Sequence, residues 1–214
     1  MKKIIYTIVL LPLLIINGQK IGNFADEKPH IAFPNNAIGF DLMIGEGGFG
    51  LGGFYRHNYS KTLTGFIDFS ISEFKAQREI ERFDIFGYPL PIYGKKNRVF
   101  LLPLHIGGQY RLFYESLTDK LRPYLSLGVG PTMVVTTPAQ KEFFKSFGLA
   151  KATFGVGGYV GFGANFGLNS SNLTGINIRY YFVQLINDGI EQYFDDFTKT
   201  LQQVTLTINI GIMY

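Results

Sequence analysis

Apolar and polar side chains alternate over long stretches of this chain, most regularly at its C-terminal end. Residues 205–214 read TLTINIGIMY. Successive side chains of a β-strand point to opposite faces, so the apolar residues of this segment share one face. They are Leu206, Ile208, Ile210, Ile212 and Tyr214. The pattern predicts a strand with one face in lipid and the other in a more polar interior.

Seven further segments alternate in the same way, and the links between them alternate in length. The predicted strands are 37–46, 49–59, 62–74, 98–114, 121–136, 153–168, 173–185 and 201–214. Short links (59–62, 115–120, 169–172) alternate with long ones (75–97, 137–152, 186–200), and the first hairpin is also short. Outer-membrane barrels have short periplasmic turns and longer extracellular loops. We therefore predict an all-β fold, an eight-stranded antiparallel up-and-down transmembrane β-barrel.

The N-terminal residues have the composition of a signal peptide. Lys2 and Lys3 precede a run of 13 mainly apolar residues, and Gly18 offers a small residue for cleavage. The alternative is a retained transmembrane helix, but this run contains Pro12 and is shorter than the roughly 20 residues that cross a bilayer. We predict a signal peptide at 1–18, a periplasmic segment at 19–36 and a barrel at 37–214, exported to the bacterial outer membrane.

Composition narrows the class further. The chain has no cysteine, which excludes disulfides, a lipid-modified cysteine and thiol catalysis. Its 26 glycines, 21 phenylalanines and 13 tyrosines are typical of tightly turned strands with aromatic girdles. Without Lys2 and Lys3, 18 basic residues remain against 16 acidic ones, a balance that gives no reason to expect nucleic acid as a partner.

Inward positions of the predicted strands carry polar residues that would form a network in the lumen. They are Asp41, Arg56, Asp68, His105, Gln109, Arg111, Asn165, Asn177, Arg179 and Asn209. Buried charges must be paired, and an eight-stranded barrel has room only for side chains or one small ligand. We predict a largely plugged lumen, with a proton or ion pathway as the alternative.

Two of the long loops have apolar residues at helical spacing. Segments 138–148 and 188–199 are predicted as short amphipathic helices at the outer end of the barrel. Their apolar residues are Phe143, Phe144, Phe147, Ile190, Tyr193, Phe194 and Phe197. These residues either anchor the loops against the rim and the lipid headgroups or form an entrance for an apolar solute. At the end of the remaining long loop, 75–97, Lys95, Lys96 and the adjoining Arg98 are candidates to pair with lipopolysaccharide phosphates.

Little in the chain points to catalysis or to a cofactor. Of the three histidines, His105 is the candidate base inside the barrel, but no nucleophile stands close to it in the sequence. His57 and Ser60 are three residues apart, but a predicted turn separates them, so they are not candidates for a catalytic histidine–serine pair. The carboxylates of Glu191, Asp195 and Asp196 match no calcium-loop spacing. We therefore predict neither an enzyme nor a metal or cofactor site.

The glycine-rich segments RPYLSLGVGPTMVV and VGGYVGFGANFGL, the strand NIRYYF and the terminal GIMY resemble those of small outer-membrane β-barrel proteins. That superfamily includes the transmembrane domain of outer membrane protein A and the W-type barrels. The resemblance covers about residues 37–214. It implies insertion by the barrel assembly machinery, which reads the last strand, here Ile208, Ile210, Ile212 and Tyr214. Tyr214 departs from the more usual terminal phenylalanine.

Four functions are compatible with this sequence. The first is a monomeric structural or adhesive barrel whose partners meet the long loops. The second is a narrow transporter or porin for small apolar solutes, entered through the loop aromatic residues. The third is a lipid-modifying enzyme that uses His105. The fourth is a soluble lipocalin-type barrel, which would expose its many outward apolar residues to water.

Overall fold

The computed structural model describes the barrel region of the chain in several stretches. They are residues 34–75, 84–86, 94–117, 120–166, 171–186, 189–194 and 196–214. The predicted signal peptide and most of the predicted periplasmic segment lie outside these ranges. No helix in the described stretches has the length and apolar character needed to cross a membrane.

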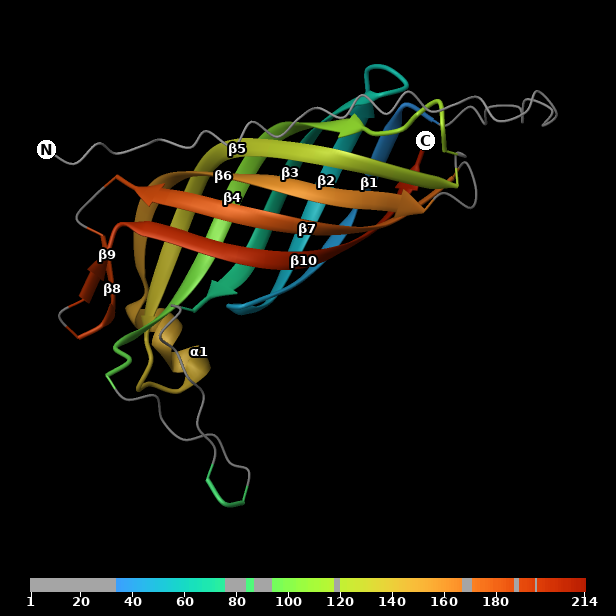
Figure 1. Ribbon diagram of the computed structural model, residues 1–214. Helices are drawn as coiled ribbons and strands as arrows, with labels where there is room; N and C mark the ends of the chain where they lie inside the picture. The colour runs from blue at the N-terminus through green and yellow to red at the C-terminus, as the bar shows by residue number, and fades with distance from the viewer. Residues whose placement is uncertain are drawn as a thin grey trace, which may run out of the picture. The chain divides into compact units, whose positions relative to one another are not determined.

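Eight long strands of the described chain close into a barrel (Figure 1). Their bounds are β1 Asn36–Gly45, β2 Gly48–Asn58, β3 Leu63–Phe74, β4 Asn97–Arg111, β5 Leu121–Pro138, β6 Lys151–Phe166, β7 Asn172–Leu185 and β10 Thr200–Met213. Each pairs antiparallel with the next long strand, and β1 pairs with β10 to close the barrel. The prediction of an eight-stranded antiparallel up-and-down barrel is confirmed.

Backbone conformation sets some strand ends that periodicity placed elsewhere. β4 ends at Arg111, before the predicted end at residue 114. Phe113 has a φ of 53°, in the left-handed region that a strand does not use. Its carbonyl oxygen accepts hydrogen bonds from the amides of Ser116 and Leu117, at 3.1 and 3.0 Å. The chain therefore turns here, although its apolar pattern continues.

The outer loops contain one short helix and one hairpin. Helix α1, Phe143–Ser146, is followed by the 3-10 turn η1, Phe147–Leu149. It confirms a helix within 138–148. The helix predicted over 188–199 is wrong, because this loop forms the strands β8, Ile190–Tyr193, and β9, Asp196–Thr198.

Contacts with the segment before β4 explain the hairpin. Lys96 N donates to Gln192 O at 2.8 Å, Phe194 N donates to Gly94 O at 3.2 Å, and the Asn97 side-chain amide donates to Glu191 O at 2.6 Å. Short apolar runs fit either a helix or a strand by period alone. Here the neighbouring chain supplies hydrogen-bond partners for an extended segment.

The barrel has two different ends. At one end, called the short-turn end, Asn36 and Tyr214 exchange backbone hydrogen bonds of 3.1 and 2.9 Å, and the links β2–β3, β4–β5 and β6–β7 are found there. The other, called the long-loop end, carries α1 and the β8–β9 hairpin, away from the C-terminus in Figure 1. In outer-membrane barrels the short turns are periplasmic.

All eight barrel strands expose large apolar side chains on their outward face. Phe40 on β1 is 74% exposed, Leu127 on β5 is 62% exposed and Phe162 on β6 is 55% exposed. A continuous apolar wall of this kind would be unfavourable in water, which argues against the lipocalin-type alternative. A closed barrel with an apolar outer band is the architecture of outer-membrane β-barrel proteins. We therefore treat this wall as the lipid-facing surface.

Candidate functional site

The centre of the lumen contains an ion-pair network around Arg179 of β7. Its side chain is 2% exposed. Arg179 Nη2 donates to Asp41 Oδ2 on β1 at 2.8 Å, and its Nη1 lies 3.7 Å from Asp68 Oδ2 on β3. Asn209 of β10 donates a further hydrogen bond to the Asp41 carboxylate. One guanidinium of β7 therefore bridges two buried carboxylates on β1 and β3, the two strands that flank β2.

The Asp68 side of the network is completed by aromatic residues and a histidine. Tyr159 Oη donates to Asp68 Oδ2 at 2.8 Å, and His105 Nδ1 lies 3.2 Å from Asp68 Oδ1. Arg179 Nη1 also donates to Tyr181 Oη at 3.2 Å. The His105 ring is fully buried and packs against the rings of Tyr159 and Tyr181, at centroid distances of 5.3 and 5.8 Å. The Asp68 carboxylate is thus contacted by side chains of β4, β6 and β7.

A second chain of hydrogen bonds joins this centre to β5. Asn177 Nδ2 donates to Tyr124 Oη at 3.2 Å, and Tyr124 Oη donates to Asn209 Oδ1 at 3.3 Å. Asn209 in turn donates to Asp41. The inward residues of β1, β5, β7 and β10 are thereby connected in one network.

The other predicted lumen residues lie nearer the short-turn end. Arg56 donates to Asn165 Oδ1 at 3.4 Å, and its guanidinium carbon lies 4.1 Å from the centroid of the Phe54 ring. The Arg111 guanidinium lies 4.8 Å from the Tyr114 ring centroid. Gln109 is buried. Of the three predicted lumen arginines, Arg179 is the one placed between the two aspartates.

Sequence reasoning did not assign the tyrosines to this network. Tyr124, Tyr159 and Tyr181 are each 3% exposed and all hydrogen-bond within it. A signal was present, because Tyr181 has the same strand parity as Arg179 and therefore the same inward face.

Buried apolar clusters lie on both sides of the polar centre. At the long-loop end, one buried cluster consists of Phe74, Val99, Leu101, Val134, Val183, Leu185, Ile190 and Leu201. At the short-turn end, a smaller cluster consists of Ala37, Phe54, Leu173 and Met213. Within the described chain, an apolar layer thus covers the polar centre at the long-loop end, and at the short-turn end the smaller apolar cluster lies beside Arg56.

The residues predicted as an apolar entrance do not gather at one place. Ile190 of β8 is 3% exposed and belongs to the layer inside the barrel. Phe143 and Phe147 pack instead on Phe100, with ring centroids 6.2 and 5.6 Å away. Phe100 lies on the outward face of β4. The seven residues are therefore divided between the barrel interior, its outer wall and the exposed hairpin.

The remaining members of that set and the predicted basic cluster have other contacts. Phe144, Phe194 and Phe197 are exposed and Tyr193 is half-buried. Lys96 forms an ion pair with Glu191, and its Nζ lies 5.5 Å from the Phe194 ring centroid. Arg98 donates to the carbonyl oxygens of Ala139 and Lys141, at 3.0 and 3.2 Å. Arg98 therefore holds the β5–β6 loop onto β4.

The described histidines have structural partners. His57 Nδ1 lies 2.7 Å from Asn36 Oδ1, and Ser60 Oγ accepts the amide hydrogens of Thr62 and Leu63 at 3.2 and 2.9 Å, as a turn residue does. His30 lies outside the described residues. Among those described, no group of three His, Cys, Asp or Glu side chains is placed to hold a metal ion.

Comparison with known proteins identifies no family for this chain. No family model matches the chain, and no curated protein matches it. Similar solved structures include Ail, the attachment invasion locus protein of Yersinia pestis, at 12% identity over 83% of this chain and 95% of that chain, with a TM-score of 0.41. The N-terminal β-barrel domain of Pseudomonas aeruginosa OprF is 12% identical over 84% and 99%, with a TM-score of 0.46. Neisserial surface protein A is 9% identical over 84% and 94%, with a TM-score of 0.49. Likeness of this degree carries no conclusion about function.

Proposed function

We propose that this protein is a monomeric outer-membrane barrel with a non-conducting lumen, and that it acts through its outer surfaces as a structural or loop-binding protein. The observation that supports this most directly is the Arg179 network, together with the apolar layer that covers it at the long-loop end. An ion crossing the lumen would have to displace the Arg179–Asp41 pair. It would also have to pass the layer around Leu101 and Leu201, which are 2% and 1% exposed. Hydrophobic constrictions of this kind exclude water.

Entry of an apolar solute receives less support than closure. The aromatic residues that would form an entrance do not converge, and Ile190 blocks the interior at the long-loop end. Catalysis is not part of the proposal either. His105 is 0% exposed and contacts Asp68, Tyr159 and Tyr181, so no lipid substrate can reach it without opening the barrel.

Conductance measurements test the closed lumen. The purified barrel is reconstituted in a planar bilayer, after heat-modifiable gel migration has shown that it is folded. We expect no steady single-channel current, whereas an open porin prepared in the same way conducts. Steady current from the folded wild-type protein would contradict the proposal. A liposome-swelling assay with small apolar solutes tests the transporter alternative separately.

Loop function and assembly are tested on the same background. We propose that partners meet the loops at the long-loop end, including lipopolysaccharide at the membrane surface. Shortening 140–149 to a brief turn should leave heat-modifiable migration intact and change only binding to cells or to lipopolysaccharide.

For assembly, replacing the exposed terminal Tyr214 by aspartate should lower insertion by the barrel assembly machinery, and Tyr214→Phe should preserve it.

A further inference from the structure

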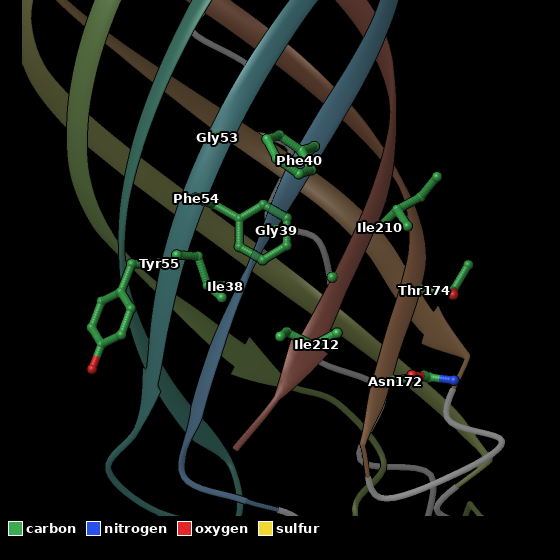
Figure 2. Close-up of a pocket in the computed structure, with 11 residues that line it drawn as sticks. Ile38, Gly39, Phe40, Gly53, Phe54, Tyr55, Asn172, Thr174, Ile210 and Ile212 are labelled. Atoms are coloured by element: carbon green, nitrogen blue, oxygen red, sulfur yellow. The ribbon is translucent and has the colours of Figure 1, made fainter.

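A groove lies on the lipid-facing wall where the first and last strands of the barrel meet. Its volume is about 820 Å³, and β1, β2, β7 and β10 all contribute to its lining (Figure 2). Ile38 and Phe40 of β1 and Ile210 and Ile212 of β10 form apolar sides, each at least 50% exposed. Figure 2 shows them beside the pairing of β1 with β10.

A second depression continues the groove toward the long-loop end. It measures about 580 Å³ and shares Phe40, Gly53 and Ile210 with the first. Leu42, Leu51, Gly52 and Phe69 complete its lining. The two depressions form one apolar trough, which we call the seam trough, along β1 and its neighbours.

The missing side chain of Gly53 explains why this part of the wall is hollow. Gly53 occupies an outward position of β2 between Leu51 and Tyr55, both of which project from the wall. A Cβ added at Gly53 would have one protein neighbour within 4 Å, the Gly39 carbonyl oxygen at 3.8 Å. Many other glycines of this barrel lie against backbone or side chains at less than 3 Å. The protein therefore leaves the space over Gly53 unfilled.

The trough ends in polar groups at the short-turn end. Tyr55 Oη donates to Asn36 Oδ1 at 2.9 Å, and His57 Nδ1 lies 2.7 Å from the same oxygen. Asn172 and Thr174 of β7 line the opposite side (Figure 2). Tyrosine at this height is typical of the boundary between hydrocarbon and headgroups. The surface is thus apolar along its length and polar at one end.

The length of the trough matches one leaflet. Asn36 at the polar end and Leu42 at the apolar end are six residues apart on β1, or about 20 Å at about 3.3 Å per residue. With a strand tilt of about 40°, this distance spans about 15 Å of membrane depth. Half of a hydrocarbon core of about 30 Å is also about 15 Å.

We propose that the seam trough binds one glycerophospholipid of the periplasmic leaflet, with an acyl chain over Gly53 and the headgroup at Asn36, Tyr55 and Asn172. The apolar sides and the single polar end reproduce the polarity of such a lipid along the membrane normal. The trough is continuous with the lipid-facing wall. A lipopolysaccharide would have its headgroup at the other end of the barrel. Packing of a second copy of this chain against the trough would not require a polar group at one end of it. The proposal does not depend on whether the lumen conducts.

A single tryptophan reports on the trough because the natural chain contains none. Phe40→Trp places the reporter between the two depressions. Ile106→Trp is the matched control, since Ile106 is 62% exposed on the outward face of β4 and lies five residues from the strand's short-turn end, while Phe40 lies four from that of β1. Each folded variant in detergent micelles is titrated with phosphatidylglycerol that carries brominated acyl chains, which quench tryptophan on contact.

We expect the Phe40→Trp variant to lose most of its fluorescence, with saturation at one lipid per barrel. The Ile106→Trp variant should show a small loss that grows linearly with lipid. Unlabelled phosphatidylglycerol should restore the signal, and lipid A should not. Adding Gly53→Leu to Phe40→Trp should abolish the saturating loss. Gly108→Leu is its matched control, because Gly108 is also an outward glycine with a single neighbour at 3.8 Å, and it should leave the loss intact.

Several outcomes would overturn the proposal. Equal quenching curves for the two reporters would mean that the wall has no preferred lipid site. If lipid A restored the fluorescence as effectively as phosphatidylglycerol, the trough would not be specific for a glycerophospholipid. An unquenched reporter together with a dimer in light scattering would assign it to a second copy. The two reporter variants suffice for these results if Gly53→Leu fails to fold.

Discussion

Replacing Arg179 by methionine should cost far more stability than its length and shape suggest. Methionine fills part of the same space but removes the positive charge. The carboxylates of Asp41 and Asp68 would then remain buried without a guanidinium at 2.8 and 3.7 Å. Removing one partner of a buried ion pair costs about 3–5 kcal/mol, because the other charge is left uncompensated. We expect a loss of this size in the free energy of unfolding.

Arg56 provides a matched control for this substitution. It is 3% exposed, but its described contacts are a 3.4 Å hydrogen bond to the Asn165 amide and the face of Phe54. Arg56→Met therefore leaves no carboxylate without its partner, and we expect a loss of about 1–2 kcal/mol. Arg179→Lys should fall between the two, because lysine keeps the charge but lacks the planar fork that reaches two acceptors.

The assay is urea unfolding in detergent micelles, followed by heat-modifiable migration and intrinsic tyrosine fluorescence. The Asp41→Asn change should destabilise the wild type but recover part of the stability lost in Arg179→Met, since it removes one uncompensated charge. Such non-additivity is expected for side chains in direct contact. Equal losses for Arg179→Met and Arg56→Met, or additive effects of Asp41→Asn, would refute the reasoning.

Three other parts of the structure are tested by further substitutions. Gly107→Ala should destabilise the barrel by about 1–3 kcal/mol in urea, because the added carbon would lie 2.0 Å from the Leu127 carbonyl oxygen, whereas Gly148→Ala, in open space, should change stability by less than about 0.5 kcal/mol. Ile190→Asp should release the β8–β9 hairpin from the apolar layer, seen as faster amide hydrogen exchange in that hairpin with an unchanged barrel midpoint; unchanged protection would mean that Ile190 does not hold it. Lys96→Gln should alter unfolding by less than about 1 kcal/mol, because its ion pair is partly exposed, and a larger effect would show that this pair is more than a surface contact.

Periodicity predicted the barrel strands because successive residues of each strand face the lumen and the lipid in turn. Shifting a strand by one residue would move Leu206 into the lumen and Thr207 into lipid, so the outward and inward faces of β10 can be read directly. The same rule extends to the middle of β5 and β6, where exposed and buried side chains alternate. It failed for residues 188–199, because the hydrogen-bond partners of β8 come from residues 94–97, far away in the chain.

The sequence by itself determined the strands, their order and which side chains face inward, since these follow from local alternation and link length. It did not determine which inward residues meet. Arg56, Arg111 and Arg179 all lie on the inward faces of their strands. The relative shift of neighbouring strands around the closed barrel decides that Arg179 is the one between Asp41 and Asp68. The seam trough likewise exists only after closure, because β1 and β10 come from opposite ends of the chain and their outward side chains become neighbours when the two strands pair.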